Sequence, residues 1–233
     1  MGNLYLIPMT LGDTPINRVI PQDVQDICRN TKIFIVENIR TTRRYLKAID
    51  KAINIDELCF LELNKHTKKE DIFSYLDKLK DGDIGIISEA GCPGIADPGA
   101  DIVEIAHRKN VNVIPLVGPS SILMAIMASG FNGQSFTFNG YIPIKSNERA
   151  SKLKELERLS KQHCQTQVFI EAPYRNVAMF EDIVKTCNKN TLLSIACDIT
   201  CENEYIKTLT VGEWKKIKPD IHKRPAIFSI FCK

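Results

Sequence analysis

The first half of the chain alternates short apolar runs with amphipathic stretches, and this alternation restricts the fold more than any other feature. Runs rich in Ile, Val and Leu predict four strands, at residues 3–8, 32–36, 83–88 and 111–116. Apolar residues at helical spacing predict five helices, at residues 21–29, 41–49, 68–79, 99–109 and 120–129. Strands that alternate with helices are typical of a parallel sheet with helices on both faces.

The second half of the chain has a different pattern. Residues 130–143 contain three glycines and alternating aromatic residues, which predict a crossing segment that becomes a strand. Further elements are expected at 147–162 (a charged helix), 167–171 (a strand), Pro173 (a helix start), 192–198 (a strand), 205–211 (a hairpin), Trp214 (a short helix) and 226–232 (a strand). The sequence therefore predicts an α/β fold of two domains, with a mostly parallel sheet in residues 1–130 and a mixed sheet in residues 131–233.

Composition and cysteine usage favour a soluble protein of a reducing compartment, the cytoplasm. Hydrophobic residues make up 44% of the chain and charged residues 25%, with no apolar run of membrane-spanning length and no basic stretch typical of a secretory signal. The eight cysteines contain no CxxC pair, so we expect reduced, mostly buried thiols. Cys197 and Cys201 come nearest to metal-ligand spacing, but they lack a second pair or a nearby His, and no metal site is expected.

The net charge of +3 implies no partner by itself, but basic residues gather in three places. Such runs are usually solvated helix faces, and the alternative is a surface for phosphates. The three groups are Arg40, Arg43, Arg44 and Lys47; Lys145, Arg149, Lys152, Lys154, Arg158 and Lys161; and Lys215, Lys216, Lys218, Lys223 and Arg224.

Residues 84–101 form the most informative segment. A buried strand ends at Ser88 and runs into a loop with Gly91, Gly94 and Gly99, and a helix is then expected with Asp97 as its cap and Pro98 at its first position. Ligands of open α/β sheets bind outside the carboxyl ends of the strands, where small residues let them approach. A tight structural turn would explain one or two glycines but not ten residues with so few bulky side chains.

Residues 115–121 repeat this arrangement at a second strand end, where Ser120 and Ser121 precede a helix. The spacing of glycines in the two segments is neither GxGxxG nor GxxxxGK[ST], which excludes the dinucleotide fingerprint and the P-loop. The two loops together predict two sides of one cleft for a small ligand, whose identity the pattern leaves open.

Six ordered segments carry a family resemblance: 4–8, 36–43, 88–99, 118–121, 128–130 and 169–175. They resemble the tetrapyrrole methylase superfamily, the class III methyltransferases that depend on S-adenosylmethionine (SAM). Within it they are most similar to the bacterial branch that methylates a cytidine ribose 2′-oxygen of small-subunit ribosomal RNA. The resemblance implies SAM in a cleft between two α/β domains, an RNA substrate and a homodimer.

The resemblance also implies roles for individual residues. The cofactor would be held by Pro8, Ser88, Glu89, Ala90, Cys92, Ser120 and Ser121, and its adenine enclosed by Phe169, Ile170, Pro225 and Ala226. The substrate side would hold Arg40, Arg43, Glu171 and Arg175. The structural alternative for Glu171 and Arg175 is a salt bridge between the domains.

The chain departs from the family pattern mainly on this substrate side. The family's Glu-Asp-Thr-Arg reads Glu37-Asn38-Ile39-Arg40, its Ser-Asp-Ala-Gly-Thr-Pro has Glu89 and Cys92, and its Glu-Ser-Pro-His-Arg has Ala172 and Tyr174. Longer members carry a further C-terminal helical segment. We therefore expect the SAM site to be kept, while the methyl acceptor stays open.

Methyl transfer to a hydroxyl needs alignment, and it benefits from a base and from positive charge near the developing alkoxide. The candidate catalytic residues are Glu37, Arg40 and Glu171, with Glu89 and His66 as further possible bases. Three functions remain open at this point: an RNA 2′-O-methyltransferase, a methyltransferase of the same fold that acts on a corrinoid or porphyrin precursor, and a SAM- or nucleotide-binding protein without catalysis.

Overall fold

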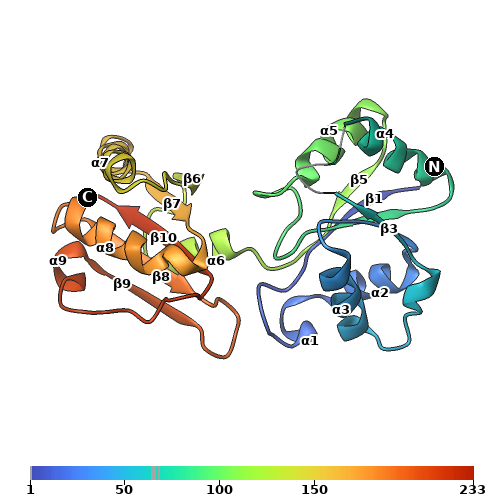
Figure 1. The fold of residues 1–233 in the computed structure, drawn as a ribbon, viewed down its shortest axis with the longest axis horizontal. Helices are drawn as coiled ribbons and strands as arrows, with labels where there is room; N and C mark the ends of the chain where they lie inside the picture. Colours follow the sequence, from blue (N-terminus) through green and yellow to red (C-terminus); the bar gives the residue numbers. More distant parts are fainter. Residues whose placement is uncertain (1, 64–66, 68) are drawn as a thin grey trace. The chain divides into compact units, whose positions relative to one another are not determined.

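The computed structural model describes residues 2–63, 67 and 69–233, and the chain divides into two compact units, Met1–Ser120 and Ser121–Lys233 (Figure 1). Each unit has its own sheet and its own hydrophobic core. This division places the helix at 121–129 in the second unit, whereas the boundary expected near residue 131 assigns it to the first.

Unit 1 is built on a parallel five-stranded sheet, as the alternation of strands and helices predicts. The strands, in the order β3-β2-β4-β1-β5, are β1 (Leu4–Ile7), β2 (Ile33–Val36), β3 (Cys59–Glu62), β4 (Ile84–Ile87) and β5 (Val113–Pro115). The helices are α1 (Ile16–Val19), α2 (Gln22–Asn30), α3 (Ile39–Ile49), α4 (Lys69–Asp77) and α5 (Gly99–Arg108), with short 3-10 turns at Ile55–Glu57 and Lys78–Lys80. Strand β3 is not among the predicted strands.

Both faces of this sheet are covered. Leu4 and Ile84 point to a core shared with α4 and α5, while Ile7 and Ile87 point to a core shared with α2 and α3. Burial on both faces explains why β2 and β4 read as continuous apolar runs, since each of their residues is buried. The helices hold the strands in place, and the loops at the carboxyl ends of β1, β4 and β5 remain available for function.

Unit 2 has a mixed sheet in the order β6-β7-β10-β8-β9, in which β6 and β7 are parallel and the other neighbours antiparallel. Its strands are β6 (Phe136–Tyr141), β7 (Thr166–Ile170), β8 (Leu192–Cys197), β9 (Tyr205–Thr210) and β10 (Ala226–Phe231). Its helices are α6 (Ser121–Ser129), α7 (Ser146–His163), α8 (Asn176–Thr186) and α9 (Val211–Trp214), with a 3-10 turn at Pro173–Arg175. The predicted hairpin is confirmed, because β8 and β9 pair in antiparallel register.

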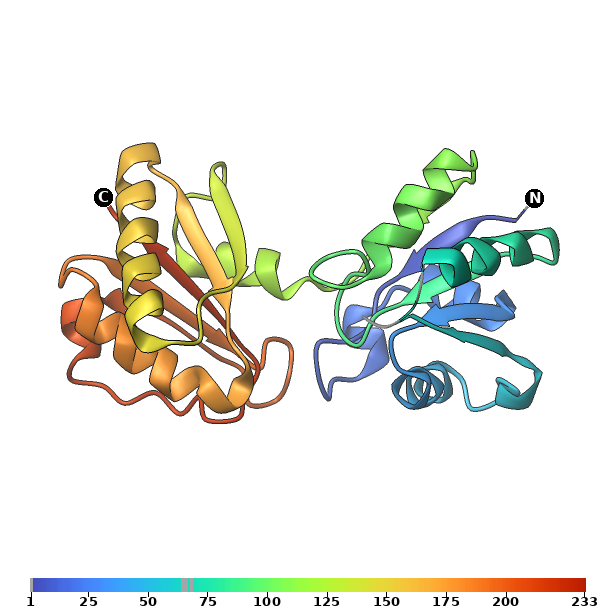
Figure 2. The same ribbon diagram turned by 45° about the horizontal axis from the view of Figure 1, so that its top comes forward.

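The core of unit 2 is aromatic. The rings of Phe169 and Phe228 stack at 5.9 Å, and Trp214 meets Phe180 edge-on at 5.6 Å. The Trp214 indole N–H donates to the Leu193 carbonyl (2.9 Å), which satisfies its one polar atom inside the core. Helix α7 runs alongside this sheet (Figure 2) and packs against β7, β10 and α8, while α6 packs against β8, β9 and β10.

All eight cysteines are free. Cys28, Cys187 and Cys197 are buried as expected, but Cys164 is exposed where α7 ends in the left-handed conformation. Within the part of the chain that the structure describes, no helix combines the length and the apolar character needed to cross a membrane.

Candidate functional site

Three loops meet at the carboxyl end of the unit 1 sheet. The Met9 and Gly91 backbones exchange two hydrogen bonds, with Met9 N–H donating at 2.9 Å and Gly91 N–H at 3.2 Å. The Cys92 thiol donates to the Pro119 carbonyl at 3.5 Å. The structure therefore brings together the loops after β1, β4 and β5, which contain Pro8, the segment 88–92 and the segment 118–120.

The backbones approach closely at Gly118. A Cβ atom at this position would lie 2.2 Å from the Pro8 Cβ, so only glycine fits. Pro8 is itself held from the other side, because the buried Tyr45 hydroxyl donates to its carbonyl at 2.7 Å. No motif in the sequence pointed to Tyr45, since its contact joins residues far apart in the chain.

Asp97 organises the loop between β4 and α5. Its Oδ1 accepts hydrogen bonds from Gly94 N–H (2.8 Å) and from Gly99 N–H (2.7 Å), the first amide of α5, although Pro98 and not Asp97 occupies the cap position. Pro98 lies just before the helix rather than at its first position. Burial raises the pKa of Asp97, and the two amides partly offset that effect.

Glu37 and Glu89 lie side by side at the ends of β2 and β4. The Glu89 N–H donates to Glu37 Oε2 at 3.4 Å. The pKa of Glu37 is raised, first by burial and then by the negative charges of Glu89 and Asp97, against the lowering effect of the Glu89 amide. A carboxylate with raised proton affinity is suited to accept a proton.

Helix α3 begins directly after Glu37. The Asn38 side chain accepts a hydrogen bond from Thr41 N–H (3.2 Å) and caps the helix, a role that the family's aspartate also suits. Arg40 is exposed in the first turn, and the exposed Arg43 lies over the Phe60 ring at 5.4 Å. The structure thus places Glu37 and Arg40 at the carboxyl end of β2, while Arg43 lies further along α3 beside Phe60 of β3.

The remaining residues assigned to the cofactor in this region differ in exposure. Ser88 is buried and its hydroxyl donates to the Ala90 carbonyl at 3.3 Å, whereas Glu89 and Ala90 are exposed. Ser120 ends unit 1 and Ser121 begins α6 in unit 2, and both are half-buried.

In unit 2 the adenine residues lie at the end of β7 and the start of β10. Ile170 pairs with Ile227, and the Pro225 carbonyl accepts from Asp198 N–H at 2.9 Å. Pro225 is exposed and Ala226 is buried. The Phe169 side chain is fully buried in the core against Phe228, and the residue lies in a strand with a neighbour on each side, so it does not face a ligand.

Glu171 and Arg175 form an ion pair of 2.6 Å within one loop of unit 2, so the alternative of a bridge between domains is wrong. Glu171 Oε1 also accepts from Ala172 N–H at 2.7 Å. The Glu171 side chain is 0% exposed, and its Oε2 has no hydrogen-bond partner among the described residues. A buried carboxylate oxygen without a partner is costly and points to a role beyond packing.

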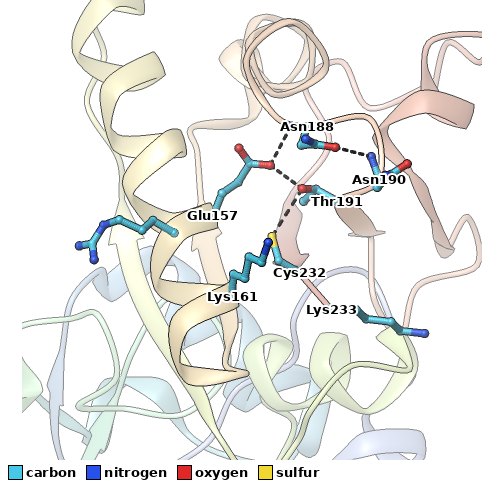
Figure 3. A pocket seen from close by; sticks show the side chains of 8 residues that line it. Glu157, Lys161, Asn188, Asn190, Thr191, Cys232 and Lys233 are labelled. Carbon is cyan, nitrogen blue, oxygen red and sulfur yellow. Dashed lines mark hydrogen bonds between the residues drawn. The ribbon is translucent and has the colours of Figure 1, made fainter.

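A polar pocket of about 290 Å³ lies at the far end of β10 from Pro225 (Figure 3). Its Glu157 carboxylate accepts hydrogen bonds from Asn188 N–H (2.8 Å) and from the Thr191 hydroxyl. Thr191 in turn contacts Cys232 Sγ at 3.5 Å. Glu157 on α7 is thus hydrogen-bonded to the turn before β8, and the pocket contains none of the predicted site residues.

His66, a candidate base, lies outside the described residues.

No family model matches the sequence. Ribosomal RNA small subunit methyltransferase I of Buchnera aphidicola (Schizaphis graminum) is 30% identical over 233 residues, which cover 98% of this chain and 78% of that protein. The chain belongs to this methyltransferase family. The protein of the same name from Vibrio cholerae is 31% identical over 90% of this chain and 69% of its own length.

Solved structures share the fold at low identity. The methyltransferase CobJ superposes with a TM-score of 0.66 at 12% identity and covers 99% of this chain and 94% of its own. Uroporphyrin-III C-methyltransferase from Thermus thermophilus, solved with S-adenosylhomocysteine, gives 0.56 at 13% identity over 99% of this chain and 97% of its own. The predicted family, α/β fold and enzyme class, a SAM-dependent methyltransferase, are confirmed.

Proposed function

We propose that this methyltransferase modifies RNA, and specifically a ribose 2′-hydroxyl of small-subunit ribosomal RNA. The observation that carries the proposal is the match along nearly the whole chain to relatives named for small-subunit ribosomal RNA. The first cofactor loop departs from the family motif at Glu89 and Cys92 but keeps Ser88, Ala90 and Gly91, so the same chemistry remains available.

The residues at the carboxyl end of the unit 1 sheet fit SAM by their chemistry. SAM carries a positive sulfonium and a positive amino group, which suit the neighbouring carboxylates of Glu37 and Glu89. The close approach at Gly118 leaves backbone rather than side chain facing the loop after β1. We assign to the cofactor in unit 1 Pro8, Ser88, Glu89, Ala90, Cys92 and Ser120.

In unit 2, the residues that we assign to the cofactor lie around the loop at the end of β7 and at the start of β10. The unpartnered Oε2 of Glu171 is a buried acceptor that a ligand donor would satisfy. We assign Ser121, Ile170, Pro225 and Ala226 to the cofactor, with Phe169 packed in the core beneath Ile170.

SAM supplies a methyl group on a sulfonium, a good leaving group. Transfer of this methyl group to an oxygen would require a group of the protein to accept the hydroxyl proton. Glu37 takes this proton, because burial raises its proton affinity while its loop keeps it at the strand end. Arg40, one turn along from Glu37, stabilises the developing negative charge on oxygen.

The acceptor side of the proposal uses guanidinium groups. Arg40, Arg43 and Arg175 are planar donors suited to phosphate oxygens, and Glu171 orients Arg175 through the 2.6 Å pair.

The protein would act in the cytoplasm, and we propose a homodimer. Helix α6 supports an assembly because Leu123 and Met127, one turn apart, are 52% and 81% exposed. Light scattering in solution tests the dimer, and a monomeric mass at assay concentration would rule it out.

The decisive experiment is transfer of labelled methyl from SAM to small ribosomal subunits of a methylation-deficient strain, followed by identification of the modified nucleoside. A labelled 2′-O-methylnucleoside is expected. Turnover on a tetrapyrrole panel with none on RNA would instead assign a small-molecule acceptor. SAM binding without turnover on either would assign a binding protein.

The cofactor site is tested by calorimetry. Replacement of Ser120 and Ser121 by Trp is expected to abolish SAM binding while the circular dichroism spectrum stays that of the wild type. Unchanged SAM affinity in this variant would show that the pocket lies elsewhere.

A further inference from the structure

The arginines of the three basic groups differ in the partners of their guanidinium groups. In the second group, the buried Arg149 pairs with Asp182 at 2.9 Å, and Lys145 and Lys152 pair with glutamates one turn away. In the third, Arg224 pairs with Asp198 at 2.6 Å and also binds backbone carbonyls. Arg149 and Arg224 therefore serve the fold of unit 2, and the exposed Arg158 donates to Gln162 on its own helix at 2.8 Å.

The first group lies on α3 of unit 1, and its Arg40 and Arg44 have no carboxylate or amide partner among the described residues. Arg40, Arg44 and Lys47 follow one another at spacings of four and three residues, so they form one stripe along the helix. All three are exposed, and among the described residues no carboxylate lies within 4.0 Å of them. Lys47 Nζ donates to the Lys51 carbonyl at 2.9 Å. Arg40 and Arg44 are therefore the cations of this stripe that remain available to a ligand.

A pocket of about 500 Å³ opens beside this stripe, entirely within unit 1. It lies between α3 and the segment that follows β1. Its lining combines hydroxyls, a carboxylate, a guanidinium and apolar carbon from Thr10, Asp13, Ile16, Thr41, Arg44 and Ala48. The volume lies in the range of about 300–1,000 Å³ that is usual for small-ligand sites.

We propose that this pocket binds one nucleotide of a single-stranded RNA segment, and that Arg40 and Arg44 hold the adjoining phosphates. The inference rests on the proposed RNA substrate. Single-stranded RNA is recognised through splayed bases and 2′-hydroxyls, which the Thr10 and Thr41 hydroxyls and the Asp13 carboxylate are suited to bind. Unpaired arginines on the rim match phosphate geometry.

The test measures binding of the full chain to a fluorescein-labelled single-stranded RNA 12-mer by anisotropy over a series of salt concentrations. The variant is Arg40→Ala/Arg44→Ala. Its matched control is Arg108→Ala/Arg158→Ala, which removes two exposed arginines from helices α5 and α7. Circular dichroism confirms that both variants are folded.

Loss of two phosphate contacts is expected to lower the slope of log K against log salt by about 1.4, at about 0.7 per contact for single strands, and to weaken binding. The control is expected to keep the wild-type slope. An unchanged slope in the α3 variant, or an equal loss in the control, would overturn the proposal, as would competition by polyglutamate as effective as that by unlabelled RNA.

The pocket itself is tested without a change of charge. Ala48→Phe on the exposed side of α3 fills it, and is expected to raise the Kd several-fold at every salt concentration with the slope unchanged. An unchanged Kd would show that the nucleotide lies elsewhere. Methyl transfer to RNA by the wild type is measured separately. Absence of methyl transfer would contradict the proposed RNA substrate, whereas methyl transfer together with unchanged RNA binding in the variants would contradict only this pocket.

Discussion

Glu37 is a residue whose charge opposes folding. Its pKa is raised in the folded state, so the native chain binds more protons than the unfolded chain, and Glu37 lowers stability as pH rises through that pKa. Glu37→Gln keeps an acceptor for the Glu89 amide but removes the charge. We expect the variant to have a larger free energy of unfolding than the wild type at pH 7.

Urea titrations of both proteins at several pH values measure this difference, which should vanish below about pH 4.3, the ordinary value for a glutamate. The same variant should lose most methyl transfer if Glu37 is the base, and activity within about twofold of wild type would exclude that role. A stability difference that stays constant with pH would show that Glu37 ionises freely.

The Glu171–Arg175 pair is the second site where a single residue matters. Glu171→Ala leaves the Ala172 amide without its acceptor and Arg175 without its partner, so we expect unit 2 to lose about 1–3 kcal/mol. Glu155→Ala removes an exposed pair with Lys152 and should cost less than about 1 kcal/mol. Urea unfolding followed by fluorescence measures both, and equal effects would show that the loop does not depend on Glu171.

At the scale of elements, the joined loops of unit 1 depend on the close approach at Gly118. Gly118→Ala places a methyl group against the rigid Pro8 ring, so the loops after β1 and β5 must separate. We expect a loss of about 1–3 kcal/mol in stability and weaker SAM binding. Gly133→Ala is the control, because its Cβ would meet nothing closer than 4.0 Å. Calorimetry measures the SAM affinity of both variants. Wild-type SAM affinity in Gly118→Ala would show that the close approach of Gly118 to Pro8 is not needed for cofactor binding.

At the scale of the whole molecule, two cores predict separable unfolding. The chain has one tryptophan, Trp214, and it lies in the core of unit 2. Leu46→Ala opens a cavity in the core of unit 1 and should cost that unit about 2–5 kcal/mol. In a urea titration, we expect part of the circular dichroism signal, that of unit 1, to be lost at a lower urea concentration than in the wild type. The unfolding midpoint measured by Trp214 fluorescence should stay within error. An equal shift of both would mean that the two units unfold as one.

The sequence predicted most of the secondary structure because apolar periodicity and turn residues are local signals. It missed β3, an edge strand with a single neighbour whose residues are only partly buried, so its pattern is weak. It placed Phe169 near the adenine, because a motif gives the position of a residue but not the direction of its side chain, which points into the core.

The sequence by itself determined the family, the cofactor and the parallel sheet of the first unit, since ordered motifs and continuous apolar strands are written along the chain. The tertiary structure decided what depends on distant residues. It joined the loops of Pro8, Gly91 and Pro119, and it held Pro8 through Tyr45. It also separated the unpaired arginines of α3 from basic residues committed to ion pairs, because a charge is neutralised by neighbours in space and not by neighbours in sequence.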